Sequence, residues 1–218
     1  MERKAAELAE SQRKQLATFK VNLEEFARKY AKEIRGDPRF RMQFQRMCQV
    51  IGVDPLVSSK GFWGELLGVG DFYCELGIQI IEICMATRPM NGGVVELGEL
   101  KRRIDRKRGN SRQQSVSEDD VKRAIKQLKP LGGGYRVITV GSRKMVQSVP
   151  RVMNTDQTEI LVLAQNKGHF SVPDVTSTYN WNDDRISACI NSMLRDGIVW
   201  VDYQVQPAQY WVSAYFFS

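Results

Sequence analysis

The stretch that decides the fold runs from Ser117 to Pro150 and reads SEDDVKRAIKQLKPLGGGYRVITVGSRKMVQSVP. Ser117 and Asp120 have the spacing of a capping box, which predicts the start of a helix. Apolar residues follow at helical spacing, and a proline with three glycines ends the helix. Two runs rich in β-branched residues come next, Tyr135–Val140 and Lys144–Val149, and they predict a hairpin. A helix that leads directly into a hairpin is typical of a winged-helix domain.

The same order of elements occurs a second time downstream. The apolar face of the first helix matches that of a second helix 65 residues later, and a second hairpin candidate follows it. A short strand and a helix precede both copies, which predicts tandem winged-helix domains in a mainly α (α+β) chain. The matched apolar positions are Val121, Ala124, Ile125 and Leu128 in the first copy and Ile186, Cys189, Ile190 and Met193 in the second.

The N-terminal part of the chain predicts an antiparallel helical hairpin. Its apolar residues step by three and four, as in the seam of a coiled coil, and Gly36-Asp37-Pro38 separates the two helices. Such a pair has a thin core by itself. We therefore expect the seam to bind a partner helix, with packing against the chain's own first domain as the alternative. The seam residues are Leu16, Phe19, Leu23, Phe26, Tyr30, Phe40, Phe44 and Met47.

These patterns divide the chain into three parts. We expect the helical hairpin at residues 1–52, the first winged-helix domain with a glycine-rich lead-in at residues 53–150, and the second at residues 151–218. Residues 1–52 carry 12 basic and 7 acidic side chains, residues 53–150 carry 16 and 11, and residues 151–218 carry 4 and 7. The overall charge of +7 therefore lies in the first two parts, and the second copy is acidic.

The sequence contains no recognisable catalytic or metal-binding constellation. His169 is the single histidine, and the four cysteines are scattered without a CxxC pair. Asp119-Asp120 and Asp183-Asp184 are carboxylate pairs at predicted helix starts, where they favour the helix dipole. We therefore expect no enzyme activity, no cofactor and no metal, and buried thiols in a reducing cytosol.

Two functions remain for tandem winged helices without catalytic residues. The first is DNA binding, since Lys122, Lys126 and Lys129 share one face of the third helix and further basic residues lie nearby. The second is protein assembly, which the acidic second copy favours. A surplus of aromatic residues near the C-terminus predicts an interface. The candidates for that interface are Trp200, Tyr203, Tyr210 and Trp211.

Several segments resemble the ESCRT-II subunit family of vacuolar protein sorting-associated protein 22. They include FKVNLEEFARKY, IGVDPL, KGFWGELLGVGDFYCELGIQIIE, NGGVVELGEL and VKRAIKQLKPLG, and the resemblance covers nearly the whole chain. It implies a scaffold subunit of a heterotetramer with one copy of a similar lipid- and ubiquitin-binding subunit and two copies of a small winged-helix subunit. It further implies a cytoplasmic complex recruited to endosomal membranes, where ubiquitinated membrane proteins are sorted into multivesicular bodies.

A membrane contact is a weaker expectation from the same resemblance. Basic residues near the N-terminus, each contributing about 1 kcal/mol at an anionic lipid surface, are the candidates. They are Arg3, Lys4, Arg13 and Lys14.

Overall fold

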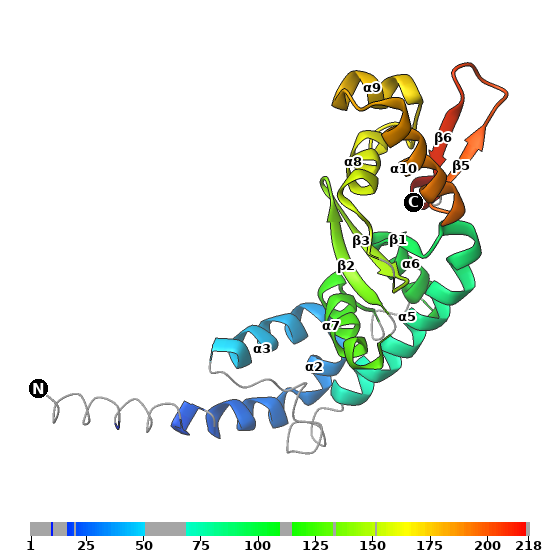
Figure 1. Cartoon of the computed structure of the whole chain (residues 1–218). Helices are drawn as coiled ribbons and strands as arrows, with labels where there is room; N and C mark the ends of the chain where they lie inside the picture. Colours follow the sequence, from blue (N-terminus) through cyan, green and yellow to red (C-terminus); the bar gives the residue numbers. More distant parts are fainter. Residues whose placement is uncertain are drawn as a thin grey trace, which may run out of the picture.

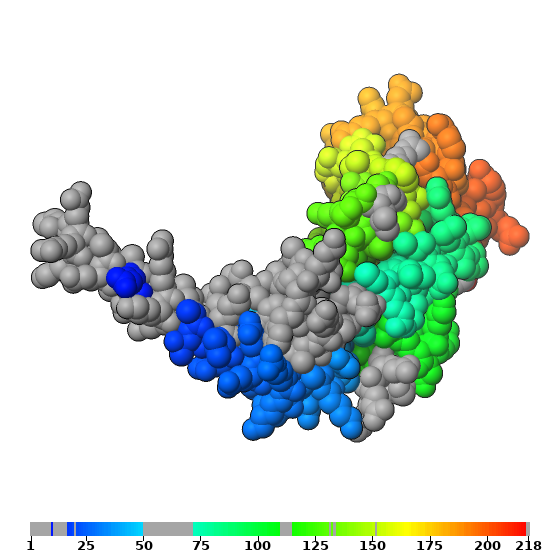
Figure 2. Space-filling model, turned by 90° about the horizontal axis from the view of Figure 1, so that it is seen from below, coloured from blue at the N-terminus to red at the C-terminus, as the bar shows by residue number. Residues whose placement is uncertain are grey.

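The structure is a computed structural model that describes residue 10 and residues 17–19, 21–50, 69–109, 115–132, 134–150 and 152–216. These residues are mainly helical, with two small antiparallel sheets. The molecule is elongated, with the N-terminal helices at one end and the C-terminal third at the other (Figure 1). Figure 2 shows the same separation of the two ends from below. The lead-in at residues 53–68 and the four basic membrane candidates lie outside the described residues.

The N-terminal helices form the expected pair. Residues 17–19 and 21–29 are helical and continue through a turn at Tyr30 into α2 (Ala31–Gly36). Helix α3 (Pro38–Val50) runs back alongside them (Figure 1). Asp37 starts α3, because its Oδ1 accepts a hydrogen bond from the backbone N–H of Arg39 at 2.8 Å. Pro38 occupies the first helical position, as its missing N–H and restricted φ favour.

The first repeat, the described part of residues 69–150, contains three helices and a three-stranded sheet. Its elements are α5 (Val69–Asn91), β1 (Val94–Glu96), α6 (Leu97–Lys107), α7 (Glu118–Leu128), the 3-10 turn η2 (Lys129–Leu131), β2 (Tyr135–Val140) and β3 (Arg143–Ser148). The predicted capping box is confirmed, since the backbone N–H of Asp120 donates to Ser117 Oγ at 3.1 Å and the N–H of Ser117 donates to Asp120 Oδ2 at 2.9 Å. Gly132 ends η2 at a φ of 66°, a conformation that glycine adopts without strain.

The second repeat, residues 152–216, has the same order of elements. They are α8 (Thr155–Ala164), β4 (His169–Phe170), α9 (Val172–Tyr179), α10 (Asp183–Arg195), β5 (Val199–Asp202), β6 (Gln209–Val212) and the short α11 (Ser213–Phe216). The sheets also match, with strand orders β1-β3-β2 and β4-β6-β5. Asn154 caps α8, because its Oδ1 accepts a hydrogen bond from the N–H of Gln157 at 2.7 Å, while Asp156 binds Arg185.

Two apolar clusters form the interior, and they do not follow the boundary between the repeats. The first joins the N-terminal hairpin to α5, α6 and α7. The second fills the second repeat but includes Val94, Val140 and Met145 from the first sheet. Alternate residues of a strand face opposite sides of a sheet. Val146 therefore lies in the first cluster while its neighbour Met145 lies in the second. One face of the first sheet therefore packs against the helices of its own repeat, and the other face packs against the second repeat.

Candidate assembly surfaces

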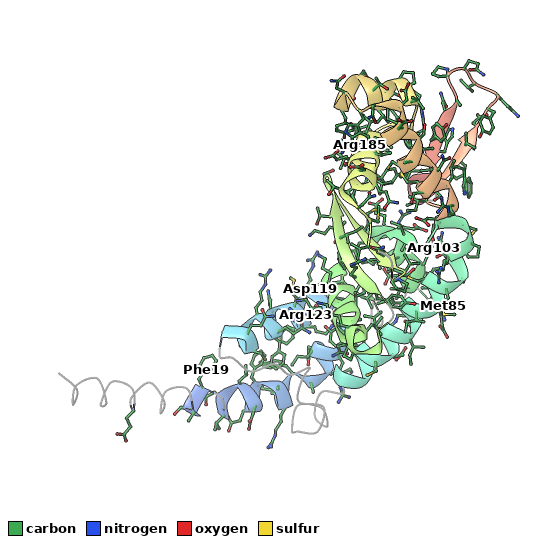
Figure 3. The ribbon with its side chains drawn as sticks, in the orientation of Figure 1. Phe19, Met85, Arg103, Asp119, Arg123 and Arg185 are labelled. Carbon is green, nitrogen blue, oxygen red and sulfur yellow. The ribbon has the colours of Figure 1, made fainter. Side chains whose placement is uncertain are left out.

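The hairpin seam is closed in its middle and open at one end. Leu23 and Phe44 are each 2% exposed, and the ring of Phe26 stacks on that of Phe44 with centroids 6.3 Å apart. Phe19 and Met47 are 47% and 37% exposed, and Figure 3 shows Phe19 at the free end of the hairpin. The predicted partner seam is therefore partly occupied by the chain itself. The side chains of Phe26, Tyr30 and Phe40 are half-buried within it, and Leu16 lies outside the described residues.

A buried polar network holds this hairpin against the first repeat. Arg41 is 1% exposed, and its Nη2 lies 2.8 Å from Oδ2 of Asp120, while its Nε donates to Oδ1 at 2.9 Å. The hydroxyl of Tyr73 donates to the same carboxylate at 2.6 Å and accepts from Nε2 of Gln45. Arg41 also donates to the carbonyl of Arg35 at the end of α2. One guanidinium thus ties α2 and α3 to the start of α7.

Burial and the charges of this network shift the pKa values of Asp120 and Tyr73 in opposite directions. Burial opposes ionisation of Asp120, but the hydrogen bonds and charge of Arg41 outweigh burial and hold the pKa of Asp120 below its ordinary value. Burial, together with the neighbouring Asp120 carboxylate, raises the pKa of Tyr73. The sequence pattern predicted Asp120 as part of a cap and contained no signal for its pairing with Arg41, which lies 79 residues away.

A second set of contacts joins the two repeats. Nη1 of Arg143, beside the β2–β3 turn, lies 3.1 Å from Oε2 of Glu96, and its Nη2 donates to the carbonyl of Gln165. Its guanidinium sits 4.9 Å from the centroid of the Tyr215 ring. The Tyr215 hydroxyl donates to the carbonyl of Leu161 at 3.0 Å, and burial raises the pKa of Tyr215 to about 12. The repeats therefore share a packed, hydrogen-bonded junction.

This junction weakens the argument for DNA binding through the basic face of the first repeat. The first hairpin packs against the second repeat through Val140 and Met145, which are buried there. Several of the basic groups are also paired within the chain. Arg103 binds Glu99, with the two charged atoms 2.7 Å apart, and Lys107 binds Glu82. Lys126 of α7 and Lys129 of η2 remain exposed and form an ordinary solvated face.

The aromatic residues near the C-terminus separate into two faces of the second sheet. Trp200 pairs with Trp211 across neighbouring strands, and the Trp200 ring lies 6.2 Å from that of Phe216. Tyr210 faces the other way and stacks on the buried ring of Phe170 at 5.4 Å. Trp200, Tyr203 and Phe216 are 42%, 71% and 62% exposed. Burial and the nearby Tyr203 raise the pKa of Tyr210, so Tyr203 lies on the Tyr210 side of the sheet. We call Trp200, Trp211 and Phe216 the aromatic face.

The described part of the chain contains neither a group of three or more potential metal ligands nor a helix long and apolar enough to cross a membrane. His169 packs its ring 4.6 Å from that of Trp211, next to the aromatic face. The arrangement within the described residues can bind other macromolecules through apolar and aromatic surfaces, and the geometry favours assembly.

Comparison with known proteins points to the same kind of role. A family model described as the EAP30/Vps36 family matches residues 2–203. Vacuolar-sorting protein SNF8 of Xenopus tropicalis is 52% identical over 204 residues, covering 93% of this chain and 79% of the relative. Vacuolar protein sorting-associated protein 22 homolog 1 of Arabidopsis thaliana is 48% identical over 201 residues, covering 91% and 80%. A chain in a crystal structure of the endosomal complex ESCRT-II (VPS22/VPS25/VPS36) superposes with a TM-score of 0.82 at 32% identity, covering 96% and 95%.

Proposed function

Because this chain belongs to the EAP30/Vps36 family, we propose that it is a scaffold subunit of the ESCRT-II complex. In that role it helps sort ubiquitinated membrane proteins into multivesicular bodies, together with the two other ESCRT-II subunit types. The observation that carries this function is the match along almost the whole chain to a subunit within a solved ESCRT-II assembly.

Each repeat is best understood as a winged helix within this proposal. Three helices and a short strand lead into a hairpin in both, and the two sheets share one strand order. The proposed divisions are the hairpin at residues 1–52 and winged-helix domains at residues 53–150 and 151–218. The packed junction supports a scaffold whose two domains keep one relative orientation, because interior packing resists small displacements.

We propose the aromatic face as the docking site for the small winged-helix subunit. The internal repeat supports this assignment. The outer face of the first sheet is covered by the second repeat, through Val140 and Met145. The equivalent face of the second sheet carries Trp200 and Trp211, and Trp200 remains 42% exposed within the described chain. Exposed aromatic groups of this kind are enriched among the residues that dominate binding energy.

The other predicted contacts have narrower support. The exposed end of the hairpin seam, Phe19 and Met47, is the part that remains open to the similar lipid- and ubiquitin-binding subunit. Recruitment to endosomal membranes through Arg3, Lys4, Arg13 and Lys14 stays a prediction, because these residues lie outside the described part of the chain.

Co-expression with the two partner subunit types tests the function. One complex of defined mass in size-exclusion chromatography with light scattering is the expected result. A chain that remains monodisperse alone and elutes separately from both partners contradicts the proposal.

A variant series tests the aromatic face separately. Trp200→Ala combined with Phe216→Ala should weaken binding of the small subunit by about 2 kcal/mol or more, as expected for interface anchors. Val162→Ala removes a comparably exposed apolar group on α8 and serves as the matched control. Equal binding by the double variant and the control assigns the docking site elsewhere.

A further inference from the structure

A groove lies where the end of α5 meets the second repeat. Its volume is about 580 Å³, and both repeats contribute to its walls. It lies apart from the aromatic face, because neither Trp200 nor Trp211 lines it. The lining residues on which the argument depends are Met85, Arg88, Val152, Met153, Arg195 and Asp196.

The floor of the groove is held by close backbone packing. Gly92 has a φ of +60°, and a Cβ added there would lie 2.6 Å from the carbonyl oxygen of Asp196. A Cβ on Gly93 would lie 2.6 Å from a methyl carbon of Val149. The two walls are therefore fixed relative to each other before any ligand arrives. A preformed site has a smaller entropic cost of binding.

The rim of the groove is apolar and unusually exposed. Met85 and Val152, on opposite repeats, are 66% and 68% exposed. Figure 3 shows Met85 on the outer side of α5. Ile78, two turns earlier on the same face of that helix, is 58% exposed, and Pro89 extends the stripe into the groove. From Ile78 to Pro89 the stripe spans roughly 16 Å, at ~1.5 Å per helical residue.

Charges of both signs lie beside this stripe, since Glu82 stands between Ile78 and Met85 on α5 and Asp196 lines the groove. Glu82 and Asp196 already have interactions within the chain. Arg88 and Arg195 are exposed and line the groove, and neither has an ion-pair partner among the described residues. The carboxylates on this side of α5 are matched, since Glu82 binds Lys107 and Glu75 lies 3.4 Å from the largely buried guanidinium of Arg108. The two arginines are therefore available to carboxylates of a bound molecule, for which guanidinium geometry is well suited.

We propose that this junction groove binds a short acidic, amphipathic segment of a partner protein. The segment places apolar side chains along Ile78, Met85 and Val152, and its carboxylates reach Arg88 and Arg195. Amphipathic helices bind apolar grooves with anchors at this spacing, and methionine adapts its shape to such anchors. We assign the segment to a partner outside the core complex, and the comparison of the chain alone with the co-purified complex tests that assignment.

The test uses the full chain with carbon-13 methyl-labelled methionine, alone and in the co-purified complex. The probe is a short acidic peptide with leucine at helical spacing. Two comparison peptides keep the same length, one with lysine for each acidic residue and one with serine for each leucine. The acidic leucine peptide should shift the methyl signals of Met85 and Met153 saturably, and both comparison peptides should leave them unchanged.

Charge reversal supplies the decisive comparison. Arg88→Glu with Arg195→Glu should weaken binding of the acidic peptide by at least about tenfold, equal to ~1.4 kcal/mol, and should create binding of the lysine peptide. Arg106→Glu with Lys126→Glu, two exposed cations outside the groove, is the matched control and should bind as the parent does. Thermal unfolding confirms that both double variants remain folded.

Three results overturn the proposal. The first is no methyl shift with the acidic leucine peptide, or the same shift in the reversed and control variants. The second is a concentration-dependent change at Met85 without peptide, which identifies a second copy as the occupant. The third is loss of the response on assembly, which makes the groove part of the subunit interface.

Discussion

The ion pair between Arg41 and Asp120 allows a stringent test of how the N-terminal hairpin is held. Both side chains are 2% exposed, and their closest charged atoms lie 2.8 Å apart. Arg41→Ala leaves the carboxylate buried without its cation, and breaking a buried pair in this way costs about 3–5 kcal/mol. Urea unfolding followed by circular dichroism should show a loss of this size at neutral pH.

A double-mutant cycle separates the pair from the rest of the network. Asp120→Asn keeps an acceptor for the hydroxyl of Tyr73 but removes the charge, so Arg41 becomes the unmatched group. The coupling energy between Arg41→Ala and Asp120→Asn should exceed about 1 kcal/mol, within the range found for residues in contact.

The pH dependence of the unfolding free energy gives an independent check, because the lowered pKa of Asp120 fixes the direction of the change. The folded-state pKa of Asp120 is lowered, so the stability it contributes is fully present above its unfolded pKa of ~3.9 and is lost as pH falls through the folded value. In Arg41→Ala the burial of Asp120 is no longer opposed by that cation, so its folded pKa rises. The variant should therefore lose less stability than the parent below pH ~4.

The matched control is Arg39→Ala, which changes an exposed arginine two residues before Arg41 on the same helix, α3. It should change stability by no more than about 0.5 kcal/mol. A loss in Arg41→Ala no larger than in this control, or a coupling energy near zero, would refute the role assigned to the pair.

Four further substitutions test other parts of the fold, each by urea unfolding. Arg143→Ala should lower the unfolding free energy by about 1 kcal/mol, because its contacts are only half-buried. Proteolysis should also cut the β2–β3 turn faster in this variant. An unchanged cleavage rate contradicts the role of Arg143 in the junction. Gly92→Ala should cost more than about 2 kcal/mol, because its Cβ meets backbone at a positive φ, whereas Gly98→Ala has open space and should stabilise α6 by about 0.5–1 kcal/mol. Ser117→Ala should cost about 1 kcal/mol, and the amide of Asp120 should exchange faster with solvent.

Local features of this chain were readable from its sequence. The helix start at Ser117, the hairpin after Gly134 and the second copy 65 residues later all depend on residues near one another in the chain. Caps, turns and helical periodicity act over a few residues, so their signals survive without tertiary information.

The candidate binding surfaces could be predicted only in part from the sequence. The aromatic surplus predicted an interface, but the four residues named do not share one face, since Tyr210 points into the core and Phe216 joins the exposed group. The hairpin seam stays a prediction as a binding site, because periodicity does not tell whether a partner or the chain itself covers an apolar stripe.

The sequence by itself determined the elements, their order and their duplication, because these follow from short-range backbone and side-chain preferences. Only the tertiary structure decided that Asp120 faces Arg41 across 79 residues, that the first sheet is buried between the repeats, and that a rigid groove remains beside Arg88. The physical reason is that burial and charge pairing depend on which distant surfaces meet, and no local pattern specifies that meeting.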